Sequence, residues 1–364
     1  MGEPHGIGVV GLGVISGQYL ETLGDHPAVR IAAAADLDAD RARSVADRFP
    51  GARALSVADL VADPAVQTVV NLTIPAAHGE VARAALAAGK NVYGEKPLAA
   101  TFDEALGVMA GAGDAWVGGA PDTVLGSGVQ TARAVVDAGE IGRPVAAVAT
   151  WLSSGHEAWH PHPDFYYREG GGPLYDMGPY YLTALFHLLG PVVHVSGASS
   201  RSRDERTIGS GPRAGERIPV EIDTHVTGVL EHAGGALSTV TFSFDAAATH
   251  AAPIEVHGES ASLTLPDPNF FDGDVTMRRP RAAEWTAIAP RAGYRGAGRG
   301  IGVLDVVRGG AGAGRASGEV ALHVLEIMSA LTRSAREGRR ITLTTTAERP
   351  PLVPLTEHEH WRTT

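Results

Sequence analysis

The first third of the chain alternates between short apolar runs and stretches with helical periodicity. The apolar runs are Ile7–Val10, Ile31–Ala35, Val69–Ile74 and Asn91–Tyr93. The helical stretches between them are Ser16–Leu23, Ala39–Phe49 and His78–Ala88. Short apolar runs are typical of strands buried on both faces, and repeated strand–helix units build a parallel sheet through right-handed crossovers. This part of the chain is therefore predicted to be a doubly wound α/β domain.

After Pro144 the pattern changes to β-rich or alternating segments separated by short turns. These segments are Val145–Trp151, Glu221–Leu230, Ala236–Ser243, Ile254–Gly258 and Ser262–Leu265. Their spacing predicts an antiparallel sheet. Two helices are expected in this part of the chain, Leu174–Leu189 and Gly318–Glu337. Arg291–Gly302 lacks periodicity and is expected to be a mobile, solvated loop; the alternative is that its arginines contact an anionic ligand.

Composition and charge narrow the class of protein. The chain has 364 residues, a formal net charge of −11 and no cysteine. The length favours two domains, and the acidic charge argues against nucleic acid and anionic membranes as partners, because both bind basic surfaces. The absence of cysteine excludes disulfides and thiolate metal sites. Residues 1–6 lack the features of a signal peptide and no apolar stretch reaches about 18 residues, so a cytoplasmic protein is expected.

A glycine turn joins the first expected strand to the first expected helix. Gly11 allows unusual backbone angles there, and Gly13 lacks a Cβ, so a pyrophosphate can approach the backbone. The N–H groups at the start of the next helix favour an anion. Asp36, which ends the second strand, can accept both ribose hydroxyls of an adenosine. The pattern predicts a dinucleotide-binding turn; the alternative is a glycine turn that binds nothing.

The charge of Asp36 also predicts which dinucleotide is preferred. A carboxylate there repels the 2′-phosphate of NADP, so NAD is the expected cofactor. Arg41 is the nearest cation in the sequence and is able to swing toward that phosphate, which leaves NADP as the alternative.

Glu95, Lys96 and Pro97 follow the expected strand at Asn91–Tyr93. The carboxyl ends of strands in a doubly wound sheet face the ligand crevice, so Lys96 is well placed to reach the reacting end of a cofactor. The alternative is a surface lysine before a helix. His78 has two similar interpretations, because it can face the crevice or pack at the start of its helix.

Asp176 and Tyr180 are expected to lie one turn apart on the same face of a helix, just after a run of glycines. An acid and a phenol that project together form a plausible proton-handling pair. The alternative makes Asp176 the N-cap of the helix and Tyr180 a core residue.

A proline-containing segment before this helix is rich in histidine and aromatic residues. It contains His156, Trp159, His160, His162, Tyr166, Tyr167 and Arg168. Aromatic rings for stacking and nitrogens for hydrogen bonds suit a hydroxyl-rich ligand. No metal site is predicted, because the prolines exclude one continuous helix and no acid–histidine spacing matches a metal site.

Together these motifs resemble the Gfo/Idh/MocA oxidoreductases, a family that includes glucose–fructose oxidoreductase and the inositol dehydrogenases. The motifs that carry the resemblance are Gly11–Ser16, Thr73–Pro75 with His78, Glu95–Pro97 and Asp176–Tyr180, and the likeness runs from about residue 6 to residue 350. It implies a Rossmann domain at residues 1–122 and, at residues 123–364, an α/β domain with a large, mostly antiparallel open sheet. Because that sheet commonly makes subunit contacts, a homodimer or homotetramer is expected. Many members have histidine where this chain has Tyr180, although some have tyrosine.

The motifs and the resemblance together assign the residues of the site. The catalytic residues are expected to be Lys96, Asp176 and Tyr180. The cofactor-binding residues are expected to be Gly11, Gly13, Val14, Ile15, Asp36, Arg41, Thr73, Pro75, His78, Glu95 and Lys96. The substrate-binding residues are expected to be Lys96, Trp159, His160, Tyr167, Arg168, Asp176 and Tyr180.

These assignments predict an NAD(P)-dependent oxidoreductase that transfers a hydride between a secondary alcohol of a sugar, cyclitol or sugar derivative and nicotinamide. Tyr180 takes the hydroxyl proton, Lys96 stabilises the charge on the same oxygen, and Asp176 orients the substrate. If Tyr180 only contacts the sugar, Lys96 is the base. Two alternatives remain open: an enzyme that cleaves glycosides through transient oxidation by a retained NAD, and a non-catalytic protein that binds a dinucleotide or a sugar.

Overall fold

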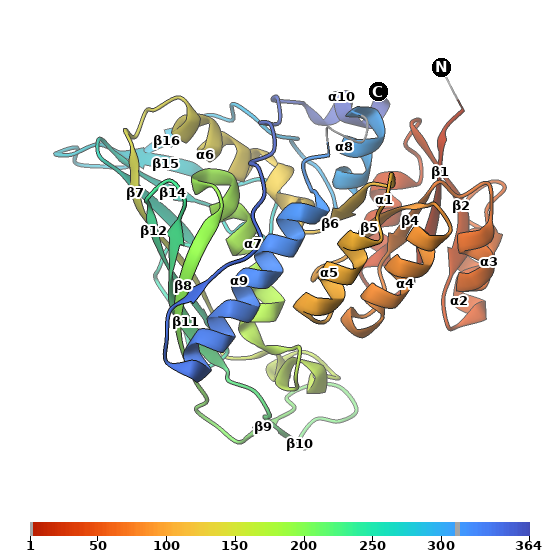
Figure 1. Ribbon diagram of the computed structural model, residues 1–364, viewed down its shortest axis with the longest axis horizontal. Coiled ribbons are helices and arrows are strands. Elements are labelled where there is room, and N and C mark those ends of the chain that lie inside the picture. Colours follow the sequence, from red (N-terminus) through yellow and green to blue (C-terminus); the bar gives the residue numbers. More distant parts are fainter. Residues whose placement is uncertain (1–2, 310–313) are drawn as a thin grey trace. The chain divides into compact units, whose positions relative to one another are not determined.

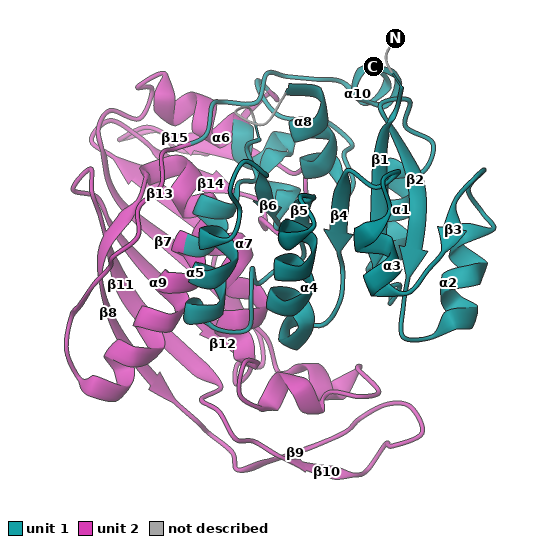
Figure 2. Ribbon diagram, turned by 45° about the vertical axis from the view of Figure 1, so that its right-hand side comes forward, with its two compact units in different colours: residues 1–130, 291–322, 350–364 teal, residues 131–290, 323–349 magenta. Residues whose placement is uncertain are grey.

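The computed structural model describes residues 3–309 and 314–364, which divide into two compact units (Figure 2). The first unit comprises residues 1–130, 291–322 and 350–364, and the second comprises residues 131–290 and 323–349. Two later segments, residues 291–322 and 350–364, therefore return to the first unit, one after each part of the second unit. The expected domain boundary between residues 122 and 123 remains a prediction.

The first unit is built on a parallel sheet (Figure 1). Its strands are β1 (His5–Val10), β2 (Val29–Ala35), β3 (Arg53–Ala54), β4 (Thr68–Asn71), β5 (Asn91–Gly94) and β6 (Val117–Gly119). Its helices are α1 (Ser16–Leu23), α2 (Ala39–Ala46), α3 (Val57–Ala62), α4 (Pro75–Ala87), α5 (Phe102–Ala110), η1 (Asp122–Leu125), α8 (Ile301–Gly309) and α10 (His358–Thr363). The described residues form a six-stranded sheet of order β3-β2-β1-β4-β5-β6. The predicted doubly wound sheet is confirmed.

Residues at the ends of the helices and strands explain where the elements of the first unit begin and end. Helix α1 has the predicted bounds, whereas β4 ends at Asn71 and not at Ile74. The reason is that Ile74 is the N-cap residue of α4 and Pro75 is its first residue, a position at which the missing N–H of proline costs nothing. Helix α2 ends at Ala46, three residues before the predicted end. The short elements β3, α3, α5 and β6 were not predicted.

The second unit contains a larger, mixed sheet. Its strands are β7 (Pro144–Leu152), β8 (Val192–Ser200), β11 (His225–His232), β12 (Leu237–Ser243), β13 (Ile254–Gly258), β14 (Ser262–Leu265), β15 (Val275–Arg278), β16 (Thr286–Ile288) and β17 (Ile341–Thr342). In the described part of the chain, these strands form a nine-stranded sheet of order β16-β15-β14-β13-β7-β12-β11-β8-β17. Only the pair β12–β7 is parallel among these described strands, so the predicted mostly antiparallel sheet is confirmed. Strands β9 (Glu205–Thr207) and β10 (Arg217–Pro219) form a separate hairpin.

Helices cover one face of this sheet. Helix α7 (Gly172–Leu189) packs on β7, β11 and β12. Helix α9 (Gly318–Glu337), which like α6 (Ser127–Asp137) contributes residues to both units, lies on β8 and β11 near Leu331. Gly197 and Gly228 pair across these strands, and a Cβ on Gly197 would lie 2.5 Å from the Leu331 carbonyl oxygen. Glycine is therefore required for the close approach of helix and sheet.

The opposite face of β7, β12 and β11 carries partly exposed apolar residues among threonines. Val148, Val229 and Leu237 are 38%, 38% and 50% exposed. Pairing places Val148 beside Thr239 and Thr239 beside Val229, so these residues share one face. This face of the second unit is the open face that the resemblance implied.

Residues 291–302 differ in part from the expected solvated loop. The segment lacks regular structure up to Ile301, where α8 begins, but Ala292 and Tyr294 are buried. Tyr294 forms isolated bridges with Gly126 and Thr356, and its hydroxyl donates to Asp305 at 2.7 Å. The segment is therefore anchored in the first unit. None of the helices in the described ranges is long and apolar enough to cross a membrane.

Candidate active site

The glycine turn after β1 is built as the sequence predicted. Gly11 has a φ of +86°, and a Cβ there would lie 2.6 Å from the backbone nitrogen of Thr73. Gly13 and Val14 are exposed, and a Cβ on Gly13 would have no described atom within 4 Å. Ile15 is the N-cap residue of α1 and provides no side-chain hydrogen bond to the described helix start. The turn therefore presents backbone N–H groups and open space to an anion.

Asp36 is held rigidly at the end of β2. Its carboxylate accepts hydrogen bonds from the backbone N–H of Leu12 at 2.7 Å and of Asp38 at 2.9 Å, and Arg41 Nη1 donates to it at 3.2 Å. Partial burial by itself raises the pKa of Asp36, but these hydrogen bonds and the Arg41 charge outweigh it and hold the pKa below the ordinary value. The carboxylate is therefore ionised, and Arg41 lies beside it.

Exposed apolar side chains follow three neighbouring strands of this sheet. Val14 comes after β1, Leu37 after β2 and Ile74 after β4, and they are 100%, 104% and 69% exposed. Apolar side chains that gather at the carboxyl ends of parallel strands are typical of a surface that a ligand covers. Leu37 and Ile74 were not among the predicted site residues, because an isolated apolar residue in a turn carries no sequence signal.

The turn between β4 and α4 is fixed by Asn71 and His78. Asn71 Oδ1 accepts from the Thr73 hydroxyl at 2.6 Å, and Asn71 Nδ2 donates to the His78 carbonyl oxygen at 3.0 Å. The His78 ring is buried, with Nδ1 2.6 Å from the Pro97 carbonyl oxygen and Nε2 2.9 Å from that of Thr73. The structure thus supports the packing interpretation of His78, which ties two loops together. Pro75 is exposed and Thr73 is half-buried at the same edge.

Lys96 lies at the carboxyl end of β5 and is half-buried. Both carboxylate oxygens of the preceding Glu95 are used within the protein: Oε1 accepts from the Tyr19 hydroxyl at 2.7 Å, and Oε2 accepts from the Lys96 N–H at 2.9 Å. The Lys96–Pro97 peptide bond is cis. Glu95 therefore shapes the backbone that carries Lys96.

In the second unit, Asp176 and Tyr180 both lie on α7. The helix begins at Gly172 with Gly171 as its N-cap, so the alternative that made Asp176 the N-cap is wrong. The Asp176 side chain is 16% exposed, and its Oδ2 lies 2.8 Å from His156 Nε2. Tyr180 is buried one turn further along. The structure thus pairs the acid of this motif with a histidine of the aromatic segment.

The aromatic segment forms two short helices, η2 (His156–Ala158) and η3 (Asp164–Tyr167). Trp159 is 58% exposed, His160 is half-buried and Arg168 is exposed, so these three predicted substrate contacts are accessible. Burial lowers the pKa of His160 below its ordinary value, with a further contribution from the nearby His156.

Tyr167 lies in the core of the second unit. Its side chain is fully buried against Ile208, Ile218, Val220 and Phe244, and its hydroxyl donates to Glu157. Its expected contact with substrate stays a prediction. The aromatic composition of the segment did not distinguish this inward ring from the outward ones.

A buried ion-pair network lies beneath this segment. Arg206 Nη1 donates to Glu157 at 2.8 Å, and Nη2 donates to the Phe244 carbonyl oxygen at 3.1 Å and to Asp245. The Arg206 side chain is 1% exposed. No sequence signal marked this network, since its members are spread over nearly ninety positions and arginine is usually a surface residue.

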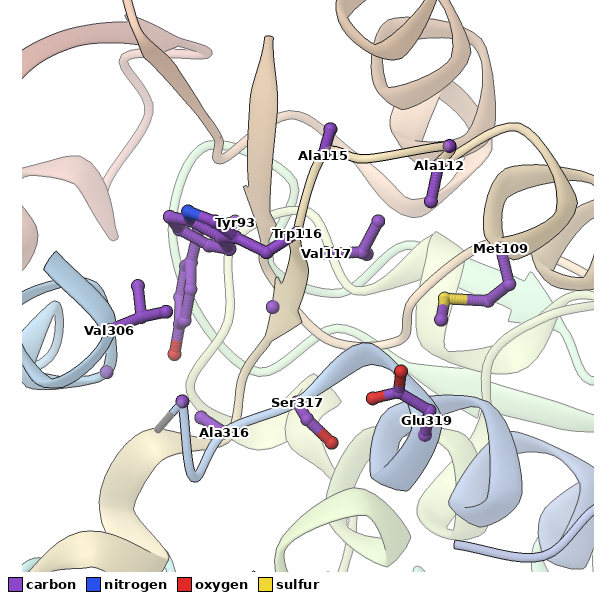
Figure 3. Close-up of a pocket in the computed structure, with 14 residues that line it drawn as sticks. Tyr93, Met109, Ala112, Ala115, Trp116, Val117, Val306, Ala316, Ser317 and Glu319 are labelled. Carbon is purple, nitrogen blue, oxygen red and sulfur yellow. The ribbon is translucent and has the colours of Figure 1, made fainter. Parts of the chain in front are cut away.

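The first unit also contains a cavity of about 290 Å³ (Figure 3). Tyr93, Trp116, Ser317 and Glu319 are among its lining residues. Tyr93 lies on β5 and Glu319 on α9, whereas Trp116 and Ser317 directly precede β6 and α9. None of the predicted site residues lines this described cavity. The residues predicted for the cofactor instead follow β1, β2, β4 and β5 at their carboxyl ends.

A parallel sheet of this order, with an anion-binding turn after β1 and an acid after β2, defines a dinucleotide-binding protein of the Rossmann class. Residues 5–114 match the family model described as oxidoreductase family, NAD-binding Rossmann fold, and residues 129–264 match the Gfo/Idh/MocA C-terminal domain. The chain belongs to the Gfo/Idh/MocA oxidoreductase family.

Similar proteins include sugar and inositol dehydrogenases. D-xylose 1-dehydrogenase (NADP(+)) 2 of Haloferax volcanii is 30% identical over 244 residues, which cover 66% of this chain and 68% of that protein. Inositol 2-dehydrogenase 3 of Saccharopolyspora erythraea is 34% identical over 146 residues, which cover 39% of this chain and 43% of that protein. The match thus spans less than half the length of that inositol dehydrogenase.

Solved structures show the same fold. Levoglucosan dehydrogenase in complex with NADH and levoglucosan has a TM-score of 0.77 at 21% identity, with 94% of this chain and 99% of that chain covered. An NAD binding oxidoreductase from Klebsiella pneumoniae has a TM-score of 0.80 at 23% identity, with 94% of this chain and 100% of that chain covered.

Proposed function

We propose that the protein is an NAD-dependent dehydrogenase that oxidises a secondary alcohol of a sugar, cyclitol or sugar derivative, or catalyses the reverse reduction. The observation that carries this proposal is Lys96, half-buried at the carboxyl end of β5 in a unit built to bind a dinucleotide. The names of the relatives, which include xylose and inositol dehydrogenases, support the same class of substrate.

The residues of the first unit fit NAD. The glycine turn and the start of α1 would hold the pyrophosphate, and Asp36 would accept the ribose hydroxyls. The exposed side chains of Val14, Leu37 and Ile74 offer apolar contact surface. When bound, the nicotinamide would accept or supply the hydride.

The proposal gives each candidate catalytic residue a task. The Lys96 ammonium stabilises negative charge on the reacting oxygen, the Asp176 carboxylate orients substrate hydroxyls, and Tyr180, in its deprotonated phenolate form, receives the proton. The exposed Trp159 and Arg168 and the half-buried His160 supply contacts to the sugar. If Tyr180 serves only as a contact, Lys96 takes the proton.

A substrate panel tests the proposal. Aldoses, cyclitols and glycosides would be incubated with NAD⁺ and with NADP⁺, and NADH or NADPH formation would be followed by absorbance. We expect at least one sugar or cyclitol to reduce NAD⁺. Cleavage of a glycoside without net NADH formation would overturn the proposal in favour of an NAD-retaining glycosidase or lyase. Binding of NAD without any turnover across the panel would favour a non-catalytic binding protein.

The proposal also covers the oligomeric state and the cellular location of the protein. The partly exposed Val148, Val229 and Leu237 on the open sheet face support a homodimer or homotetramer formed through that face. The acidic net charge of −11 argues against nucleic acid or an anionic membrane surface as a partner, and a cytoplasmic enzyme with small-molecule partners remains part of the proposal.

A further inference from the structure

We infer that His156 is a positioning residue for the proposed reaction, because it fixes the direction in which the Asp176 carboxylate points. The inference rests on the proposed function, in which Asp176 orients the substrate. It adds a residue from outside the α7 motif to the machinery of the second unit.

The contact itself is close and specific. His156 Nε2 lies 2.8 Å from Asp176 Oδ2, although the two residues are 20 positions apart in the chain. A carboxylate only accepts hydrogen bonds, so the proton of the imidazole is on Nε2. The side chains are 11% and 16% exposed, so little water competes for this hydrogen bond.

Aromatic rings hold the imidazole in place. The ring centroid of His156 lies 4.4 Å from that of Tyr166, 4.8 Å from Phe244, 5.1 Å from Trp159 and 5.9 Å from Trp151. The interplanar angles of these contacts run from 59° to 70°, the tilted and edge-on arrangements that aromatic pairs favour. These contacts restrict the rotation of the ring, so the donor at Nε2 keeps its direction.

The backbone on both sides of His156 is also fixed. Glu157, the next residue, forms the buried ion pair with Arg206 and accepts from the Tyr167 hydroxyl. Gly155, the preceding residue, has a φ of +103°, and a Cβ there would lie 2.2 Å from Glu157 Oε2. The His156 carbonyl oxygen accepts from the His160 N–H at 2.8 Å. A histidine that is fixed by its ring and by its backbone can determine the orientation of its hydrogen-bond partner.

Two substitutions separate positioning from packing. His156→Gln keeps an N–H donor at about the reach of Nε2, whereas His156→Leu removes the donor and keeps an apolar side chain. We expect His156→Leu to lower kcat at least about 10²-fold and His156→Gln to recover to within about 10-fold of the parent. The Kd for NAD⁺ should be unchanged in both variants, because Asp176 and the cofactor turn lie in different units. His250→Gln, an exposed histidine after β12, is the matched control and should keep full turnover.

The outcomes are distinguishable from failure of the proposed function. Suppose that the parent reduces NAD⁺ with a panel substrate. The inference is then overturned, and the proposed function stands, if His156→Leu is as active as the parent. The same conclusion follows if the His156→Gln and His156→Leu variants lose equal activity. If the parent is inactive on the whole panel, the proposed function fails. In that case ¹⁵N NMR of the histidine rings decides the contact: the Nε2–H tautomer of His156 should be lost or shifted in Asp176→Asn, and an unchanged His156 signal would overturn the inference.

Discussion

Asp36 is the residue through which we expect the chain to distinguish NAD from NADP. Its ionised carboxylate accepts from Leu12 and Asp38, and Arg41 already donates to it. We expect NAD to bind more tightly than NADP by about 1–3 kcal/mol, and Asp36→Ser to reduce that preference because it removes the repulsion and frees Arg41. Calorimetric titration of both cofactors checks this. Asp40→Ser, an exposed acid on α2, is the control, and tighter binding of NADP to the parent would reject the prediction.

Lys96 is expected to act in turnover and not in cofactor affinity. Lys96→Ala should leave the Kd of NAD within a few-fold of the parent and lower kcat at least about 10²-fold, the scale of a lost charge-stabilising or proton-handling group. The control is Lys90→Ala, which removes a lysine whose Nζ donates to the Asp63 carbonyl oxygen. Near-normal turnover of the Lys96 variant would make this lysine a structural turn residue.

Tyr180 tests the identity of the proton acceptor. Tyr180→Phe removes only the hydroxyl, so folding should persist while kcat falls steeply. Tyr180→His should restore part of the rate and move the limb on which the rate rises with pH to lower pH. A proton acceptor acts only when it is deprotonated, and an imidazole titrates near ~6.5 whereas a phenol titrates near ~10. Tyr181→Phe is the neighbouring control, since Tyr181 hydrogen-bonds Asp267. A fully active Tyr180→Phe would exclude the phenol from the mechanism.

The η2 helix, which carries His156, depends for its position on one buried arginine. Arg206→Met leaves Glu157 and Asp245 as carboxylates without their buried cation, and we expect the free energy of unfolding to fall by about 3–5 kcal/mol. Arg340→Met, which breaks an exposed pair with Glu231, should cost only about 0–1 kcal/mol. Denaturant unfolding measures both. Equal losses for the two variants would show that the buried network adds nothing beyond a surface pair.

The sequence predicted the bounds of an element most accurately where the apolar positions of that element follow a regular period. Helix α9 and the strands β13 and β14 have the predicted bounds because their apolar positions follow one period throughout. Strand β8 was missed, since its sequence VVHVSGASS turns polar and small after the first four residues. Gly197 of β8 is required for the close approach of α9, a tertiary requirement that no local pattern expresses.

The prediction of the site was likewise limited by contacts between residues that are far apart in the sequence. Gly11, Asp36 and Lys96 are recognisable because each lies at a strand end, where topology alone places ligand-binding residues. The contact of His156 with Asp176 and the burial of Tyr167 depend on how one loop packs on a sheet, so the sequence pattern could list these residues but could not distinguish their roles.

At the scale of the whole molecule, the open face of the nine-stranded sheet predicts self-association. Light scattering should give a mass of two or four chains, and Val229→Glu should shift the protein toward monomers because it places charge in a partly apolar interface. Leu106→Glu, an exposed apolar position on α5, is the control for a general effect of added charge. A monomeric parent would contradict the proposed assembly.

The return of late segments to the first unit has a consequence for synthesis on the ribosome. Asp122 accepts from the N–H groups of Gly300 and Gly302 at 2.8 and 3.0 Å, and His26 Nε2 lies 2.7 Å from the carbonyl oxygen of the buried Trp361. Gly300, Gly302 and Trp361 are translated long after the residues that they contact. Folding from the N-terminus onward therefore cannot finish the nucleotide-binding unit first. The first unit is therefore completed only after the second unit has been made.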